Sequence, residues 1–179
     1  MATSILTVPY ASQRDNATGT GWRECFSSSC AMVAMFWGKV RSDDEYNSRR
    51  IRHGDTTEAH AQIETLRELG LRVSFWQTGT QADLIRVLSA GRPVAVGWLH
   101  QGHVATPRGG HWSVIVGADR EGLVMHDPMG EPLLVSGGHR LDRSGRNVRC
   151  GWFNWSRRWS PEAPGRGWWL DVAPLDARG

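Results

Sequence analysis

Three residues have the types needed for nucleophilic catalysis by a thiol: Cys25, His111 and Asp127. A cysteine nucleophile needs a base, a group that orients the base, and hydrogen-bond donors for the oxyanion that forms during the reaction. Cys25 stands where a polar, glycine-rich loop gives way to an apolar run that begins at Phe26 and has no glycine or proline before Gly38. The sequence therefore predicts a thiol at the start of a helix, where the helix dipole and free backbone N–H groups favour the thiolate. Taken alone, such a cysteine is more often a small buried hydrophobic residue.

His111 is the best candidate for the base, because it opens an apolar strand behind two glycines, at the expected open edge of a sheet. A turn near residues 120–121 would pair Asp127 beside Ser113 and diagonal to His111, with about 7–8 Å between α-carbons. A carboxylate at that range can reach the far ring nitrogen of the histidine. The neighbouring His126 should point to the opposite face of the strand, which makes it the poorer base.

The other histidines offer weaker chemistry. His100, His103 and His139 fall in expected loops, and we interpret each as solvated or structural. The spacing of His100 and His103 would suit a metal, but no third ligand follows at a recognisable zinc spacing. We therefore expect neither a metal nor a cofactor.

Helices and strands that would position these residues follow from hydrophobic periodicity and turn signals. Helices are expected from Cys25 to Trp37, from Ser42 to Ile51, from Thr57 to Leu69, and from Thr80 to just before Gly91. Phe26, Cys30, Val33, Ala34 and Trp37 recur at helical spacing and predict one buried face on the first helix. Strands are expected at residues 5–8, 71–76, 94–99, 111–117, 123–126 and 168–172, with 133–135 as a further candidate. Helices that precede an antiparallel sheet indicate an α+β fold.

Length and composition indicate one globular domain spanning residues 1–179, in which 40% of residues are hydrophobic and 22% charged. No apolar run is long enough to cross a membrane, so we expect no membrane insertion. The N-terminus resembles no secretory signal, so we expect synthesis in the cytoplasm. We also expect a monomer. Three cysteines cannot all pair, which favours a reducing compartment. We place Cys30 in the core and assign no role to Cys150. A net charge of +3 is too weak to indicate nucleic-acid binding.

The segment after Val135 is rich in arginine and tryptophan. Its arginines would hold the protein on a polyanionic surface, and exposed tryptophans would stack on sugars. These residues are Arg140, Arg143, Arg146, Arg149, Arg157 and Arg158, among Trp152, Trp155 and Trp159. Trp22, Trp112, Trp168 and Trp169 also lie in or beside polar and glycine-rich segments. The alternative is that this segment is a packed extension of the domain.

Four motifs in order resemble the C39-like peptidases of the papain-like cysteine peptidase superfamily. They are Val8-Pro9-Tyr10 with Ser12-Gln13, then Cys25 with Ala31-Met32-Val33, then Gly91-Arg92-Pro93-Val94, and last Gly110-His111-Trp112-Ser113-Val114-Ile115-Val116-Gly117 with His126-Asp127-Pro128. The resemblance implies a papain-like fold with N-terminal helices packed on a C-terminal antiparallel sheet. It also implies Cys25 as nucleophile, His111 as base, Asp127 as its orienting group and Gln13 as a side-chain donor to the oxyanion. The sequence departs from the family at Phe26 and Ser27, where Gly and Pro are common.

The leading prediction is a cysteine hydrolase that cleaves an amide bond. Peptidoglycan is the predicted substrate, as in a phage endolysin acting at the cell wall, because the chain is small, mildly basic and rich in tryptophan. A general cysteine peptidase and an acyl- or peptidyltransferase with the same triad remain open. A non-catalytic wall- or peptide-binding module is the alternative from another class, although such a module would need none of the four catalytic candidates.

Overall fold

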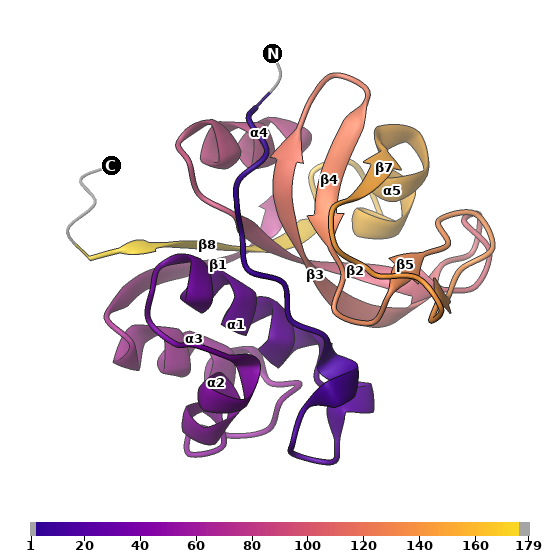
Figure 1. Ribbon diagram of the computed structural model, residues 1–179. Coiled ribbons are helices and arrows are strands. Elements are labelled where there is room, and N and C mark those ends of the chain that lie inside the picture. Colours follow the sequence, from indigo (N-terminus) through magenta and orange to yellow (C-terminus); the bar gives the residue numbers. More distant parts are fainter. Residues whose placement is uncertain (1–2, 176–179) are drawn as a thin grey trace.

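The computed structural model describes residues 3–175, which form a mixed α+β fold around a six-stranded antiparallel sheet (Figure 1). The strand order is β1-β8-β2-β3-β4-β7, in which the strands are β1 (Leu71–Gly79), β2 (Val94–Gln101), β3 (Arg108–Ala118), β4 (Gly122–His126), β7 (Val148–Gly151) and β8 (Gly167–Pro174). A separate two-stranded ribbon pairs β5 (Glu131–Pro132) with β6 (His139–Arg140). The helices are α1 (Cys25–Phe36), α2 (Asp43–Arg50), α3 (Ala59–Glu68), α4 (Gln81–Ser89) and α5 (Trp152–Trp159).

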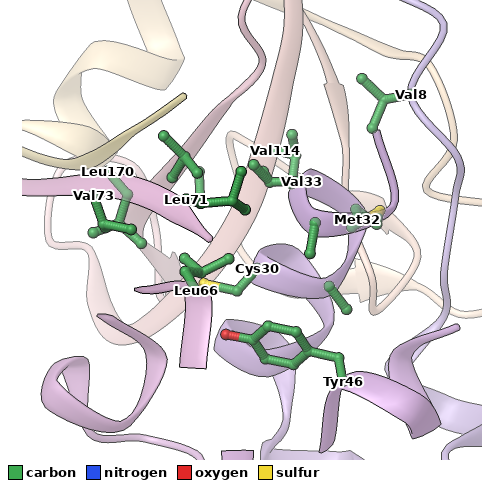
Figure 2. Close-up of a cluster of buried hydrophobic side chains, with 14 of the residues drawn as sticks. Val8, Cys30, Met32, Val33, Tyr46, Leu66, Leu71, Val73, Val114 and Leu170 are labelled. Atoms are coloured by element: carbon green, nitrogen blue, oxygen red, sulfur yellow. The ribbon is translucent and has the colours of Figure 1, made fainter. Parts of the chain in front are cut away.

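One face of the sheet carries the first hydrophobic core, which is built around α1 (Figure 2). Every residue of α1 from Phe26 to Ala34 is buried, because the sheet, α2 and α3 surround the helix. The sequence predicted burial of only one face of this helix, whereas all of its faces are buried over this range. Ser27 of α1 finds a partner inside this core, since its hydroxyl lies 2.6 Å from the Thr56 hydroxyl. Cys30 packs against Tyr46 of α2, which confirms its expected place in the core.

The opposite face of the sheet packs against α4 and α5. Three tryptophans of the arginine-rich segment form much of this second core, namely Trp152, Trp155 and Trp159. They are 8%, 0% and 3% exposed, so the expectation that these rings form a sugar-stacking surface is wrong. Spacing of three and four residues places the rings on one face of α5, and that periodicity would have indicated a buried helix face.

Pairing of β3 with β4 has the register expected from the sequence. Val114 lies opposite His126, which puts the next pair, Ser113 and Asp127, side by side just beyond the end of β4. His126 points away from that site and binds the Val8 carbonyl through Nε2 at 3.0 Å. The register therefore supports the choice of His111 over His126.

Other expectations differ from the structure at irregular segments. Residues 5–8 form no regular strand, although the Leu6 N–H donates to the Val116 carbonyl at 2.8 Å. Residues 133–135 form a turn rather than a strand, and neither β7 nor α5 was expected. Over residues 3–175, no helix has the length and apolar character of a membrane span.

Arg158 of α5 is a fully buried cation that binds backbone carbonyl groups. Its guanidinium donates to Leu134 O at 2.7 Å, Leu99 O at 2.9 Å, Gly102 O at 2.7 Å, Gln101 O at 3.3 Å and Val135 O at 3.5 Å. These carbonyls come from the end of β2 and from the loop between β5 and β6. Arg158 thus joins two irregular segments whose polar groups would otherwise lack partners in the interior.

Replacing Arg158 by Met should lower the free energy of unfolding by about 3 kcal/mol, because several buried carbonyls lose their donor at once. Arg157→Met is the matched control, since the neighbouring Arg157 is exposed and should change stability by less than about 0.5 kcal/mol. Urea denaturation of both variants measures the difference. Equal stability of the two variants would contradict a clamping role for Arg158.

Candidate active site

The Asp127 carboxylate is fully buried and receives hydrogen bonds from four residues. His111 Nε2 lies 3.0 Å from both carboxylate oxygens, and the Ser113 hydroxyl donates to Oδ2 at 2.8 Å. The Met129 N–H donates to Oδ1 at 2.9 Å, and His139 Nε2 lies 3.2 Å from Oδ2. Burial alone would raise the pKa of Asp127, but the His111 charge and the hydrogen bonds from His111 and His139 hold that pKa well below its usual range. The carboxylate is therefore ionised and acts only as an acceptor.

His111 is buried on β3 between this carboxylate and the Cys25 thiol. Burial lowers the pKa of His111, but the charges of Asp127 and Cys25, and hydrogen bonds to both, outweigh it and raise the pKa to about 10. Because Nε2 is engaged by Asp127, Nδ1 is the ring nitrogen left for the thiol. The arrangement supplies an imidazolium between a carboxylate and a sulfur nucleophile.

The residues that follow Cys25 and His111 pack directly on each other. Phe26 and Trp112 stack with ring centroids 3.6 Å apart and an interplanar angle of 3°. This contact joins the first turn of α1 to β3, so it brings the thiol to the imidazole. Phe26, one of the departures from the family pattern, therefore has a clear structural role.

The loop before Cys25 is fixed by a second buried carboxylate, which belongs to Glu24. Glu24 accepts hydrogen bonds from Asn16 Nδ2 at 2.6 Å, Thr18 Oγ1 at 2.8 Å and Thr20 Oγ1 at 2.9 Å. These bonds hold residues 16–20 against the start of α1. We did not expect this role, because a single acidic residue beside a cysteine carries no recognisable spacing.

Gln13 is fully buried in the short 3₁₀ helix Gln13–Asp15. Its backbone N–H donates to the Pro128 carbonyl at 3.0 Å, and its Nε2 donates to the Gly21 carbonyl at 2.8 Å. A Cβ at Gly21 would collide with the Gln13 carbonyl, so this close approach requires glycine. A primary amide carries two N–H donors, and among the described residues only the Gly21 carbonyl accepts from Nε2. Gln13 is thus tied both to the residue after Asp127 and to the loop that leads into Cys25.

Two histidines that we treated as solvated or structural loop residues also lie at the site. The His139 side chain is 3% exposed and contacts Asp127, and His100 stacks on His111 with centroids 4.7 Å apart and an interplanar angle of 23°. The solvated alternative for His139 is therefore wrong. His103 is exposed, as expected.

Within the described residues, His100, His111 and His139 each offer a ring nitrogen within 4.8 Å of the other two. Both His111 and His139 direct Nε2 at Asp127, so these two nitrogens already have a hydrogen-bond partner. The cluster is therefore better suited to hydrogen bonding than to metal coordination.

The remaining thiols, at Cys30 and Cys150, are free but buried. Burial raises the pKa of Cys30 far above its usual range and that of Cys150 to about 12. Neither thiol therefore supplies a thiolate at neutral pH. Cys25, which is partly exposed, is the accessible one of the three.

A cavity of about 270 Å³ opens beside His111. Gly97, Gly110, Trp112 and Trp168 are among the residues that line it. A larger hollow of about 950 Å³ lies between α4 and residues 156–165, but none of the four catalytic candidates lines it. Of the four candidates, His111 alone lines the smaller cavity.

Three solved structures that share this fold are peptidases or peptidase domains. A putative C39-like peptidase from Bacillus anthracis has a TM-score of 0.66 at 13% identity, covering 95% of this chain and 96% of that one. A double-glycine-motif protease from an AMS/PCAT transporter, in complex with its leader peptide, has a TM-score of 0.61 at 17% identity, covering 98% and 99%. The peptidase domain of Streptococcus ComA, a bifunctional ABC transporter involved in quorum sensing, has a TM-score of 0.57 at 19% identity, covering 86% and 93%. These likenesses confirm the predicted papain-like α+β fold.

The family model described as papain-like cysteine protease AvrRpt2 matches residues 3–135, and the chain belongs to this family of cysteine peptidases. The matched range contains Gln13, Cys25, His111 and Asp127. No curated protein sequence matches the chain.

Titration of His111 should depend on the charge of Asp127. The raised pKa means that the imidazolium keeps its proton until about pH 10. Asp127→Asn removes the negative charge, so the imidazolium becomes less stable and should lose its proton at a pH lower by at least about one unit. Nuclear magnetic resonance of the His111 ring measures both midpoints. The signal of the exposed His60 should be the same in both proteins, and an unshifted His111 would contradict the pairing.

Proposed function

We propose that this cysteine peptidase hydrolyses amide bonds with Cys25 as nucleophile, His111 as acid and base, Asp127 as orienting group and Gln13 as oxyanion donor. The observation that carries the proposal is the buried Asp127 carboxylate bonded to His111, whose raised pKa also reflects the Cys25 thiol. A charged imidazole beside a thiol at a helix N-terminus provides both the nucleophile and the proton for the leaving group.

In the proposed reaction, the Cys25 sulfur attacks the carbonyl carbon, and the oxygen becomes negatively charged. The free amide N–H of Gln13 and the backbone N–H at the start of α1 would donate to that oxygen. As the C–N bond breaks, His111 gives its proton to the leaving amine, and a thioester remains on Cys25. His111 then takes a proton from water, which attacks the thioester; the C–S bond breaks, the acid is released, and the Cys25 thiolate and the His111 imidazolium are restored.

The cavity beside His111 favours a peptide substrate. Its lining combines tryptophan rings with two glycines, Gly97 and Gly110, and a Cβ at Gly110 would meet no atom within 4 Å. An extended chain can therefore approach β3 closely at Gly110. One protein with the same fold is known in complex with a leader peptide, which agrees with this substrate class.

We retain peptidoglycan stem peptides as the proposed substrate, in the manner of a phage-type lysin, on a revised set of surface residues. Trp152, Trp155 and Trp159 are buried and cannot bind sugars. Two other tryptophans near the site are exposed: Trp22, three residues before Cys25, at 74%, and Trp168, which lines the cavity, at 48%. Exposed arginines suited to an anionic wall are Arg140, Arg143, Arg146, Arg149 and Arg157, whereas Arg158 is buried.

The substrate test incubates the protein with Gram-negative sacculi and, separately, with casein, using Cys25→Ala as the inactive control. We expect new amine ends from sacculi in mass spectra of the wild-type digest and none from the variant. The masses identify the bond, either the sugar–peptide amide or a bond within the stem peptide. Cleavage of casein with intact sacculi would overturn the wall substrate and leave a general peptidase.

Gln13→Ala should lower kcat by roughly 10²–10³-fold, because the oxyanion loses a preorganised donor. Gln77→Ala is the matched control, since Gln77 is exposed on β1 and should leave kcat unchanged. Alkylation of Cys25 by iodoacetamide should proceed at the wild-type rate in both variants, because the thiol and imidazole are untouched. A wild-type kcat in Gln13→Ala would contradict the oxyanion role and leave Gln13 with a structural role in the loop that leads into Cys25.

A further inference from the structure

We infer that His139 is a positioning residue for the reaction: its Nε2–H holds the Asp127 carboxylate in place, and His100 holds His139 in that tautomer. The inference rests on the proposed roles of Cys25, His111 and Asp127. It concerns two histidines that the hydrolysis itself does not use.

The donor role of His139 follows from its contact with an ionised carboxylate. Asp127 can only accept, so His139 Nε2, at 3.2 Å, must carry a hydrogen. Oδ2 then receives bonds from His139 and from Ser113, while Oδ1 receives one from the Met129 N–H. Donors on both oxygens hold the carboxylate in place, and His111 Nε2 lies at an equal distance of 3.0 Å from the two oxygens.

His100 determines which nitrogen of His139 carries the hydrogen. The two Nδ1 atoms face each other at 3.5 Å, so only one of them can be protonated at a time. Burial, together with the charge of His111, lowers the pKa of His100 to about 3, which keeps that ring neutral. A neutral His100 that donates from Nδ1 leaves His139 with an acceptor at Nδ1 and its hydrogen on Nε2.

Charged groups around the pair agree with this arrangement. Asp127 and His111 face it from the ends of β4 and β3, and the Arg158 guanidinium of α5 acts on His100 as a further positive charge. The bond to the Asp127 carboxylate needs only a hydrogen on His139 Nε2, which a neutral ring supplies.

The backbone also holds the two histidines together. The Gly138 N–H donates to the His100 carbonyl at 2.7 Å, and β6 places His139 opposite Pro132. Arg158 binds carbonyls on both sides, at Leu99 beside His100 and at Leu134 before the turn to β6. The segments that carry the two rings are thus joined by main-chain contacts as well as by the rings themselves.

The wild-type protein allows a first test that needs neither a variant nor a substrate. Nitrogen-15 chemical shifts of the imidazole rings report which nitrogen is protonated. We expect His139 to be protonated at Nε2 and His100 to be neutral with its hydrogen on Nδ1 at pH 7. A His139 ring with an unprotonated Nε2 would overturn the inference.

The second test follows alkylation of Cys25 by iodoacetamide in His139→Leu, His139→Gln and the control His103→Leu. Without the donor, the carboxylate and the His111 ring are less well held, so the thiolate loses its counter-charge. We expect His139→Leu to react about 10-fold more slowly than the wild type at pH 6, which matches the loss of one hydrogen bond to a charged group. At pH 10 the two rates should be equal, because the thiolate then forms without the counter-charge of His111. Glutamine can donate from a similar distance, so His139→Gln and the exposed His103→Leu should retain the wild-type rate at both pH values.

Three outcomes would overturn the positioning role: a wild-type rate for His139→Leu at pH 6, an equally slow His139→Gln, or slow reaction at both pH values. Circular dichroism verifies that each variant is folded. Failure of the proposed function has a different signature, because Cys25 of the wild type would then react at pH 6 no faster than free cysteine.

Discussion

A carboxylate without access to water, that of Asp127, is the constraint on which the rest of the site depends. A buried charge is unfavourable unless donors surround it. Four residues supply them from β3, from β6 and from the turn after β4. Its backbone is equally engaged, since the Tyr10 hydroxyl donates to the Asp127 carbonyl and the Asp127 N–H donates to the Gly145 carbonyl. Asp127 therefore joins β3, β6 and the turn after β4 through its carboxylate, and the loops at Tyr10 and Gly145 through its backbone.

Packing, rather than charge, places the Cys25 thiol next to His111 and Asp127. Phe26 and Trp112 stack across the junction of α1 and β3, and the burial of α1 from Phe26 to Ala34 leaves the helix no freedom to turn. On the opposite side, Gln13 is bonded to Pro128 and to Gly21. The proposed nucleophile, base and oxyanion donor are thus held by a helix, a strand and a loop that share contacts next to Asp127. Rigid supports of this kind provide the preorganisation that catalysis of acyl transfer requires.

The parts of the fold with regular periodicity could be predicted from the sequence, and the irregular parts could not. An apolar run was enough to predict the helix at Cys25. A turn and the alternation of strand residues were enough to predict the register that places Asp127 beside Ser113. His139 was missed because its position depends on the turn between β5 and β6, on two glycines in left-handed conformation and on the distant Arg158. The tryptophans of α5 were misassigned because composition was given more weight than helical spacing.

Trapping the acyl-enzyme tests the central claim, that Cys25 is the nucleophile, most directly. The protein would be mixed with a p-nitrophenyl ester of an N-acetylated amino acid, quenched in acid after release of the first equivalent of nitrophenol, and mapped by peptide mass spectrometry. We predict one acyl group on Cys25, none on Cys30 or Cys150, and none in Cys25→Ala. Turnover with the acyl group on another residue, or with no acyl group on Cys25, would contradict the account.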